Sequence, residues 1–290
     1  MKNKTKNPRL VIFIVWLVLI ALLTTAVILL LPPGEKHETI KEVMRDGVLH
    51  EDNKMSFFSL NVNPGVISAY TVTAILLLTA VIIRIFIIPR FKTVPGKIQA
   101  VLEWMVEFFR GMARQNSHHK TGFIGAYIFC AGVYIFFGTL FELFGAQWTT
   151  TAGHVMALPA PLSDINAAIA MGVMSYSIIL GAGLICGGIR GGLGVLKDFS
   201  LPISMSFRLF GALLSGLLVT ELVYYYVALS FVLPVIVGVM FTLLHAAIQT
   251  YVLATLVSIF YGEAVEPKPP REKKAKKKNV FYYFKKLYII

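Results

Sequence analysis

Long runs of apolar residues fill most of the chain and are separated by short polar segments. A transmembrane helix needs about 20 consecutive residues that are mostly apolar. Six runs reach that length, so the pattern predicts an all-α, polytopic membrane protein with about six membrane-embedded helices. These runs cover about Leu10–Leu31, Val66–Ile88, Thr121–Gly145, Ile165–Cys186, Leu201–Ala228 and Val235–Tyr261.

The first run also has to be weighed as a signal peptide, because lysines precede it. The apolar part of a signal peptide is only about 7–15 residues long and ends at a cleavage site of small residues. Leu10–Leu31 is longer, and it runs into two prolines and a glycine without such a site. We therefore expect this helix to be retained.

Between the second and third runs, Val94–Gln115 mixes apolar and charged residues at helical spacing. Glu103 and Glu107 are four residues apart and share one face of the predicted helix. An apolar stripe accompanies them, formed by Ile98, Val101, Leu102, Met105, Phe108 and Phe109. This pattern is typical of a helix that lies on the membrane surface rather than crossing it.

Composition agrees with the pattern and narrows the class of protein. Apolar residues make up 57% of the 290 residues and charged residues 14%, whereas a soluble domain usually carries about 25% charged residues. Two cysteines exclude a disulfide-stabilised scaffold and a four-cysteine zinc site. The chain is therefore not an ordinary soluble enzyme.

The net charge of +12 is explained by where the basic residues lie. With six crossings both termini share one side, and 21 lysines and arginines fall on that side against 4 on the other. Positive residues favour the cytoplasmic side of a membrane. We therefore predict that both termini are cytoplasmic, and we expect no nucleic-acid partner. The lysine-rich tail has two interpretations, contact with anionic lipid and simple solvation.

Few ionisable groups lie within the predicted spans. Placing each one in a membrane costs free energy, so each is a candidate for a functional role. Arg84 lies one turn from the end of its span, where its side chain can reach the membrane surface. Glu142 lies within a turn of the external end of its span, so an interface role and a functional role both stand. Arg208 lies about two turns inside an apolar run and is the strongest functional candidate.

Three polar residues lead toward Arg208 along the last two predicted spans. Glu221 follows it on the same helix, and His245 and Gln249 lie four residues apart on one face of the next. At about 1.5 Å per residue, Glu221 and His245 lie nearest the external side, Gln249 is deeper, and the arginine is deepest. A Glu–His pair that leads to an arginine indicates a path for protons or other ions.

The remaining reactive residues form no recognisable active site. His118 and His119 are adjacent but lack the further ligands that a metal site needs. The glycines at 187–194 lack the Gly-Lys-Ser/Thr ending of a phosphate-binding loop and indicate a flexible cytoplasmic turn. Neither a nucleophile elbow nor an HExxH motif occurs in the sequence. We expect no catalytic residue, cofactor, metal or bound nucleotide in this chain.

At these residues the chain resembles the a subunit of the rotary F-type ATP synthase. Around its arginine that family has small residues, an aliphatic or aromatic residue, Arg-Leu and another small residue, as Ser204–Gly211 has here. The resemblance covers roughly Pro64–Glu266, and five motifs in the right order make it highly specific. The other four are Val94–Gln99 with Glu103, Pro161–Asn166, Ile248–Val252 and Tyr261–Ala264.

The resemblance implies a non-catalytic stator subunit whose last two long helices form a tilted hairpin against a ring of c subunits. Each ring subunit carries a carboxyl group, and an arginine separates two aqueous half-channels that open to opposite sides of the membrane. By this resemblance Arg208 is the essential arginine and Gln249 is its polar neighbour. The half-channels would carry protons or sodium ions, and the ring carboxyl largely decides which.

The same resemblance implies the partners. They are the c-ring, the b subunit of the peripheral stalk, the catalytic headpiece reached through that stalk, and membrane lipid. One copy of this chain is expected in each complex, in which ion flow is coupled to ATP synthesis.

The sequence departs from the family pattern near the external side. Ala212 replaces the family's usual asparagine. Leu217 stands where the family usually has an acidic residue or histidine, and Thr242 stands where it has the partner of that residue. Glu221 lies one turn beyond Leu217, and His245 lies nearly one turn beyond Thr242. Our hypothesis is that Glu221 and His245 replace the family pair. Three further polar residues would then line the external mouth of this half-channel: Asp164, Asn166 and Glu142.

The competing hypothesis is a stand-alone ion transporter or permease. Such a protein typically has internal repeats, with broken helices at matching positions in two halves. Arg208 has no counterpart in the first half of the chain, which favours the stator.

The predicted organisation has three parts. They are an extra membrane helix with an external polar segment over 1–65, an ion-translocating helical core over 66–262, and a basic cytoplasmic tail over 263–290. The N-terminus lacks the features of a mitochondrial transit peptide, and the charge pattern favours a bacterial plasma membrane. An organelle-encoded chain would also lack a transit peptide, so that alternative stays open.

Overall fold

The computed structural model describes residues 14–16, 18–19, 21–22, 25, 55–57, 60–117, 121–149, 151, 155–225 and 233–266. Within these ranges the chain is mostly helical, and its strands form two short hairpins. The predicted span Leu10–Leu31 lies largely outside the described residues, and the basic tail lies almost wholly outside them.

The two hairpins lie near the ends of the long helices and were not expected from the sequence. β1 (Met55–Phe57) pairs with β2 (Leu60–Val62), and β3 (Gln147–Thr149) pairs with β4 (Val155–Ala157), both in antiparallel fashion. Three-residue strands are too short to give a recognisable alternation of apolar and polar residues. A small apolar cluster joins them to the helices: Met55, Ile67, Val72, Phe141 and Leu158.

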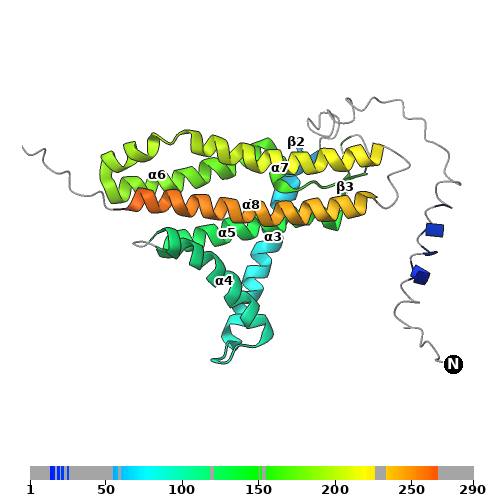
Figure 1. Cartoon of the computed structure of the whole chain (residues 1–290), viewed down its shortest axis with the longest axis horizontal. Coiled ribbons are helices and arrows are strands. Elements are labelled where there is room, and N and C mark those ends of the chain that lie inside the picture. Colours follow the sequence, from blue (N-terminus) through cyan, green and yellow to red (C-terminus); the bar gives the residue numbers. More distant parts are fainter. Residues whose placement is uncertain are drawn as a thin grey trace, which may run out of the picture.

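The first long helix stands apart from the others. α3 (Pro64–Ile82) continues as a π-helical segment (Ile83–Ile87) and a 3-10 turn (Ile88–Arg90). Figure 1 shows α3 crossing the remaining helices steeply, and its far half is exposed. The proline at position 64 starts the helix, where its missing N–H costs nothing.

α4 (Lys97–Asn116) confirms the helix predicted over Val94–Gln115. Glu103 and Glu107 are exposed, and the end of the helix buries Phe109, Met112 and Ala113 against its neighbours.

The remaining helices form a bundle in which α8 occupies the centre. α5 (Thr121–Phe141) leads through the turn η3 (Glu142–Phe144) and the second hairpin to η4 (Pro161–Ser163). α6 (Ile165–Leu196), α7 (Ser200–Tyr225) and α8 (Leu233–Val265) follow. α8 packs against α4, α5, α6 and α7, so its register determines how the polar residues of the other helices line up.

Small residues allow these helices to approach closely. Gly132 of α5 faces α8, where Thr250 donates a hydrogen bond of 3.4 Å to its carbonyl oxygen. The ring of Phe109 occupies the space that a side chain at Gly132 would need. This is the usual way in which membrane helices pack, because lipid offers no hydrophobic driving force between them.

The glycine-rich stretch after the fourth predicted span is helical on both sides of a sharp break, not a flexible turn. α6 runs well past the predicted end at Cys186 and is interrupted at Gly188, where φ is 58° and ψ is −155°. Glycine adopts this conformation without strain. The chain then folds back, so that the Tyr176 hydroxyl donates to the carbonyl oxygen of Val195 at 3.3 Å. A methyl group on Gly191 would overlap the carbonyl oxygen of Gly183, so the reversal requires glycine there.

By length and composition, four helices in the described part of the chain can cross a membrane: Pro64–Arg90, Thr121–Phe144, Ile165–Leu196 and Val235–Val265. The protein is an all-α, polytopic membrane protein, but this number is smaller than the six predicted. One of the six is Leu10–Leu31, discussed above. Another is the run Leu201–Ala228, which corresponds to α7; part of its side chains lie outside the described residues, over which alone the four were counted.

Candidate ion-translocation site

The candidate residues lie on α7 and α8, which run antiparallel (Figure 1). The two helices touch where His245 meets Gly216. A methyl group added to Gly216 would lie 3.4 Å from Nδ1 of His245, so the imidazole rests directly on the α7 backbone. On its own helix the His245 ring also packs on Phe241, with ring centroids 5.7 Å apart. This contact shows the register of the two helices.

The register places Gln249 between His245 and the level of Arg208. Gln249 is one turn beyond His245 on α8, about 6 Å along the axis, and is only 5% exposed. At 100° per residue the two side chains differ by about 40° around the helix, so they follow one face. Arg208 lies eight residues before Gly216 on α7, about 12 Å from the His245 level in the same direction as Gln249. The structure therefore keeps the order of depth that the sequence predicted.

Arg208 itself is exposed on the outer surface of α7. Among the described residues it has no ion-pair or hydrogen-bond partner. The positions beside it on this face are small: Ser204, Gly211 and Ser215 are all exposed, and a methyl group on Gly211 would meet nothing within 4 Å. A partner can therefore approach the guanidinium closely from this side.

The exposed side of α8 continues the same surface. Arg208 lies about 80° around α7 from Gly216, and Ile248 lies about 60° around α8 from His245. Because the two helices are antiparallel, these two rotations place Arg208 and Ile248 on the same side of the α7–α8 pair. The α8 residues there are large, apolar or aromatic, and exposed: Leu244 at 56%, Ile248 at 44% and Tyr251 at 54%. One arginine thus stands in an otherwise uncharged helical face.

Asp164 has a structural partner at the start of α6. It is the N-cap of α6, and its Oδ1 accepts a hydrogen bond of 2.9 Å from the backbone N–H of Asn166. It is only 8% exposed because the start of α3 covers it, and a methyl group on Gly65 would come within 2.9 Å of its Cβ. A side-chain oxygen at this position satisfies one of the free N–H groups of a helix start.

The other external candidates are less enclosed. Asn166 is exposed, and Glu142 is half-buried in η3, which contacts α8. Glu221 lies on α7 five residues beyond Gly216, about 7.5 Å toward the external end, and its side chain is outside what the structure describes. The structure thus brings His245 and Gln249 onto one face, while the pairing of Glu221 with His245 stays a prediction.

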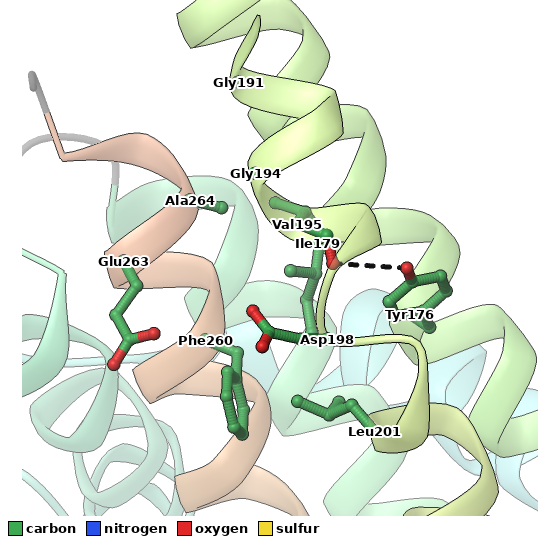
Figure 2. Close-up of a pocket in the computed structure, with 10 residues that line it drawn as sticks. All are labelled: Tyr176, Ile179, Gly191, Gly194, Val195, Asp198, Leu201, Phe260, Glu263 and Ala264. Atoms are coloured by element: carbon green, nitrogen blue, oxygen red, sulfur yellow. Dashed lines mark hydrogen bonds between the residues drawn. The ribbon is translucent and has the colours of Figure 1, made fainter.

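A pocket of about 180 Å³ lies at the opposite end of the bundle, between α8 and the reversal that joins α6 to α7. Figure 2 shows the Asp198 carboxylate pointing toward α8, with Phe260 and Glu263 on the facing helix. Asp198 precedes Arg208 by ten residues, so the pocket lies roughly 15 Å beyond the arginine along α7. Arg208 is therefore placed between the His245 level and an acidic pocket on the other side.

Sequence reasoning missed this pocket. Asp198 and Glu263 are 65 positions apart and belong to different helices, and no local motif connects them. Only the fold-back of α6 at Gly188 and the packing of α8 bring them to one cavity.

The sequence model of the ATP synthase A chain family matches residues 69–262, which is more than half of the chain. The chain belongs to the ATP synthase A chain family. Arg208, His245 and Gln249 all lie inside the matched region, and the N-terminal segment and the basic tail lie outside it. Membership makes this a proton-translocating membrane subunit of ATP synthase, which works in a complex with other subunits.

Asp164 offers a test of the site's framework. Replacing Asp164 with alanine removes the cap of α6 and should lower the free energy of unfolding by about 1 kcal/mol. Asp164→Asn keeps an oxygen that can accept from the Asn166 N–H and should retain most of that stability. The measurement is thermal unfolding of the purified chain in detergent. Equal stability of the alanine variant and the parent would contradict the capping role.

Proposed function

We propose that this subunit forms two aqueous half-channels, one on each side of Arg208, and that protons pass through them to and from carboxyl groups of a c-ring. The ring would turn against the exposed face of α7 and α8, and its rotation would couple proton flow to ATP synthesis. The observation that carries this proposal is the exposed position of Arg208 in an uncharged face of small and apolar residues.

The chemistry of the guanidinium suits this position. Arginine stays protonated at any relevant pH, so it cannot accept and release a proton and thereby short-circuit the path. A fixed positive charge in a poorly solvated face favours the ionised form of an approaching carboxyl group. A ring carboxyl that reaches Arg208 would therefore release its proton to one half-channel and reload from the other after rotation.

The outer half-channel would run along His245 and Gln249. Both lie on the α7-facing side of α8, and neither carries a permanent charge that would block a proton. Glu221 would pair with His245 in place of the family pair, and the external mouth would be formed by Asp164, Asn166 and Glu142. Asp164 combines this position with its capping of α6.

The inner half-channel would open at the acidic pocket of Figure 2. A carboxylate at a channel mouth raises the local concentration of protons. Asp198 points from the α6–α7 connection toward α8. A proton that enters there would travel roughly 15 Å along the two helices to the level of Arg208.

The complex needs further partners to hold this subunit still while a ring turns. We propose that these are the c-ring, the b subunit of the peripheral stalk and, through that stalk, the catalytic headpiece, with one copy of this chain in each complex. The distribution of lysine and arginine supports a bacterial plasma membrane with both termini cytoplasmic.

The central test is Arg208→Ala in the assembled complex. ATP-driven proton pumping into inverted membrane vesicles should fall to the level of an uncoupled control, because a ring carboxyl would keep its proton when it passes the interface. Arg84→Ala is the matched control, since Arg84 is also exposed and lies at the end of α3, outside the α7–α8 face. It should pump at the parental rate.

Assembly must be checked by co-purification of the other subunits before the pumping rates are compared. Coupled pumping that survives Arg208→Ala in an assembled complex would overturn the proposal.

The outer pair is tested by Glu221→Leu and His245→Leu, made one at a time. Each should lower the rate of proton pumping severalfold without loss of the assembled complex, because leucine can neither bind nor pass on a proton. If both variants pump like the parent, these residues do not replace the family pair.

The inner opening is tested by Asp198→Asn. The rate of ATP-driven pumping into inverted vesicles should fall, and the difference from the parental rate should grow as the pH of the medium outside the vesicles rises. A carboxylate that collects protons matters most when protons are scarce. Glu103→Gln, which removes an exposed carboxylate from α4, is the control. A deficit that is the same at all pH values would contradict a proton-collecting role.

A further inference from the structure

A large groove separates the far end of α3 from α4, and the proposed ion path does not use it. α4 packs on α5 and α8 but not closely on α3, and in Figure 1 the two helices diverge from the segment that joins them. The cavity between them has a volume of about 900 Å³. Pockets that hold a drug-sized organic molecule measure about 300–1,000 Å³, so this groove can take a ligand of that size.

The walls of the groove are apolar, and its back is firmly held. Three helices contribute aliphatic or aromatic side chains to these walls: Ala80, Ile83, Leu102, Val106 and Phe129. The ring of Phe129 packs edge-on against Phe109, with ring centroids 5.7 Å apart, and Phe109 is buried in the bundle. Apolar walls favour an occupant that is itself apolar over water, so the groove suits a hydrocarbon chain.

Two charged side chains of α4 at this groove have no partner of opposite charge. Glu103 and Arg110 both line the cavity, and both are exposed. Among the described residues neither takes part in an ion pair, since the pair on this helix joins Arg114 to Glu107. Glu103 accepts a hydrogen bond of 2.7 Å from the side-chain amide of Gln99, which leaves its charge uncompensated. The groove therefore offers one unpaired cation and one unpaired anion.

These two charges lie close together on the surface of α4. Glu103 and Arg110 are seven residues apart, so they differ by about 20° around the helix and by roughly 10 Å along it. Trp104 also lines the groove and is 67% exposed. Tryptophan is enriched where lipid head groups meet the apolar part of a membrane. The charged edge of the groove is therefore at head-group level, with the apolar walls beside it.

We propose that this groove binds one zwitterionic phospholipid with a primary ammonium group, of the phosphatidylethanolamine type. An acyl chain lies along the apolar walls, Arg110 binds the phosphate, and Glu103 accepts hydrogen bonds from the ammonium group. Arginine matches phosphate oxygens with two parallel N–H bonds. A trimethylated ammonium has no N–H to donate to Glu103, and an anionic head group brings no cation to it.

The bound lipid fills a space between α3 and α4 that the side chains of this chain leave open. α4 in turn supports α8, because the carbonyl oxygen of Met112 accepts a hydrogen bond of 3.0 Å from the hydroxyl of Ser258. The lipid thus steadies the helix on which α8 rests. This site goes beyond proton transfer and does not depend on the function of Arg208.

The experiment is native mass spectrometry of the delipidated full-length chain. The chain is incubated with equal amounts of phosphatidylethanolamine, phosphatidylcholine and phosphatidylglycerol that share the same acyl chains. The parent should retain one phospholipid, and phosphatidylethanolamine should exceed each of the other two severalfold. Equal retention of the three lipids would overturn the proposal, because a nonspecific layer of lipid does not distinguish head groups.

Two substitutions separate the head-group contacts. Arg110→Ala should lower the retention of all three lipids severalfold, because each contains the phosphate. Glu103→Gln should keep the total retention but remove the preference for phosphatidylethanolamine over phosphatidylcholine. Arg84→Ala is the matched control and should behave like the parent, since Arg84 is exposed near the end of α3 but does not line the groove. Parental retention by Arg110→Ala, or a parental preference in Glu103→Gln, would contradict the proposed contacts.

A second measurement locates the lipid in the assembled complex. Phosphatidylethanolamine with a photoreactive group in its acyl chain should cross-link to residues of the groove walls such as Phe91, Val106 and Phe129. Cross-links that form on the isolated chain but are lost in the complex would overturn the proposal, because a segment of another subunit would then fill the groove.

Discussion

The contact of the His245 ring with Gly216 marks the register of α8 against α7, and the levels of the other polar groups on the two helices are measured from it. With this register Gln249 lies about one turn closer to the level of Arg208, and the acidic pocket lies at the far ends of the same helices. A methyl group at Gly216 would meet the His245 ring at ordinary van der Waals distance, so a larger side chain there would have to displace the ring. Because α8 also packs on α4, α5 and α6, its position is set by the whole bundle.

Membrane helices can hold polar groups only where a partner, water or another chain supplies what lipid cannot. Each polar group here meets that condition differently. Asp164 is used by its own helix start, and Thr250 bonds to the backbone of α5. Arg208 faces outward with small neighbours and has no partner among the described residues. This difference sets Arg208 apart from the polar residues that maintain the fold, and it is what the proposed function uses.

The end of α8 away from His245 joins two acidic regions with different environments. The pocket beside Asp198 is open to the α6–α7 reversal and lies in line with Arg208, which suits exchange of protons with solvent. The pocket beside Ser117 lies where the C-terminal ends of α4 and α8 meet. Glu263 borders both pockets.

The apolar runs by themselves determined the helical class and the approximate positions of α3, α5, α6 and α8, because about 20 apolar residues have few other stable arrangements. They also singled out Arg208, since a charge in such a run is conspicuous, and the order of Gln249 and His245 follows from helical rise alone. Only the tertiary structure decided that the chain reverses at Gly188, that the start of α3 covers Asp164, and that Asp198 meets α8. These features depend on contacts between residues far apart in the chain, which a periodic pattern does not encode, because periodicity records which face of a helix is apolar but not which helix covers it.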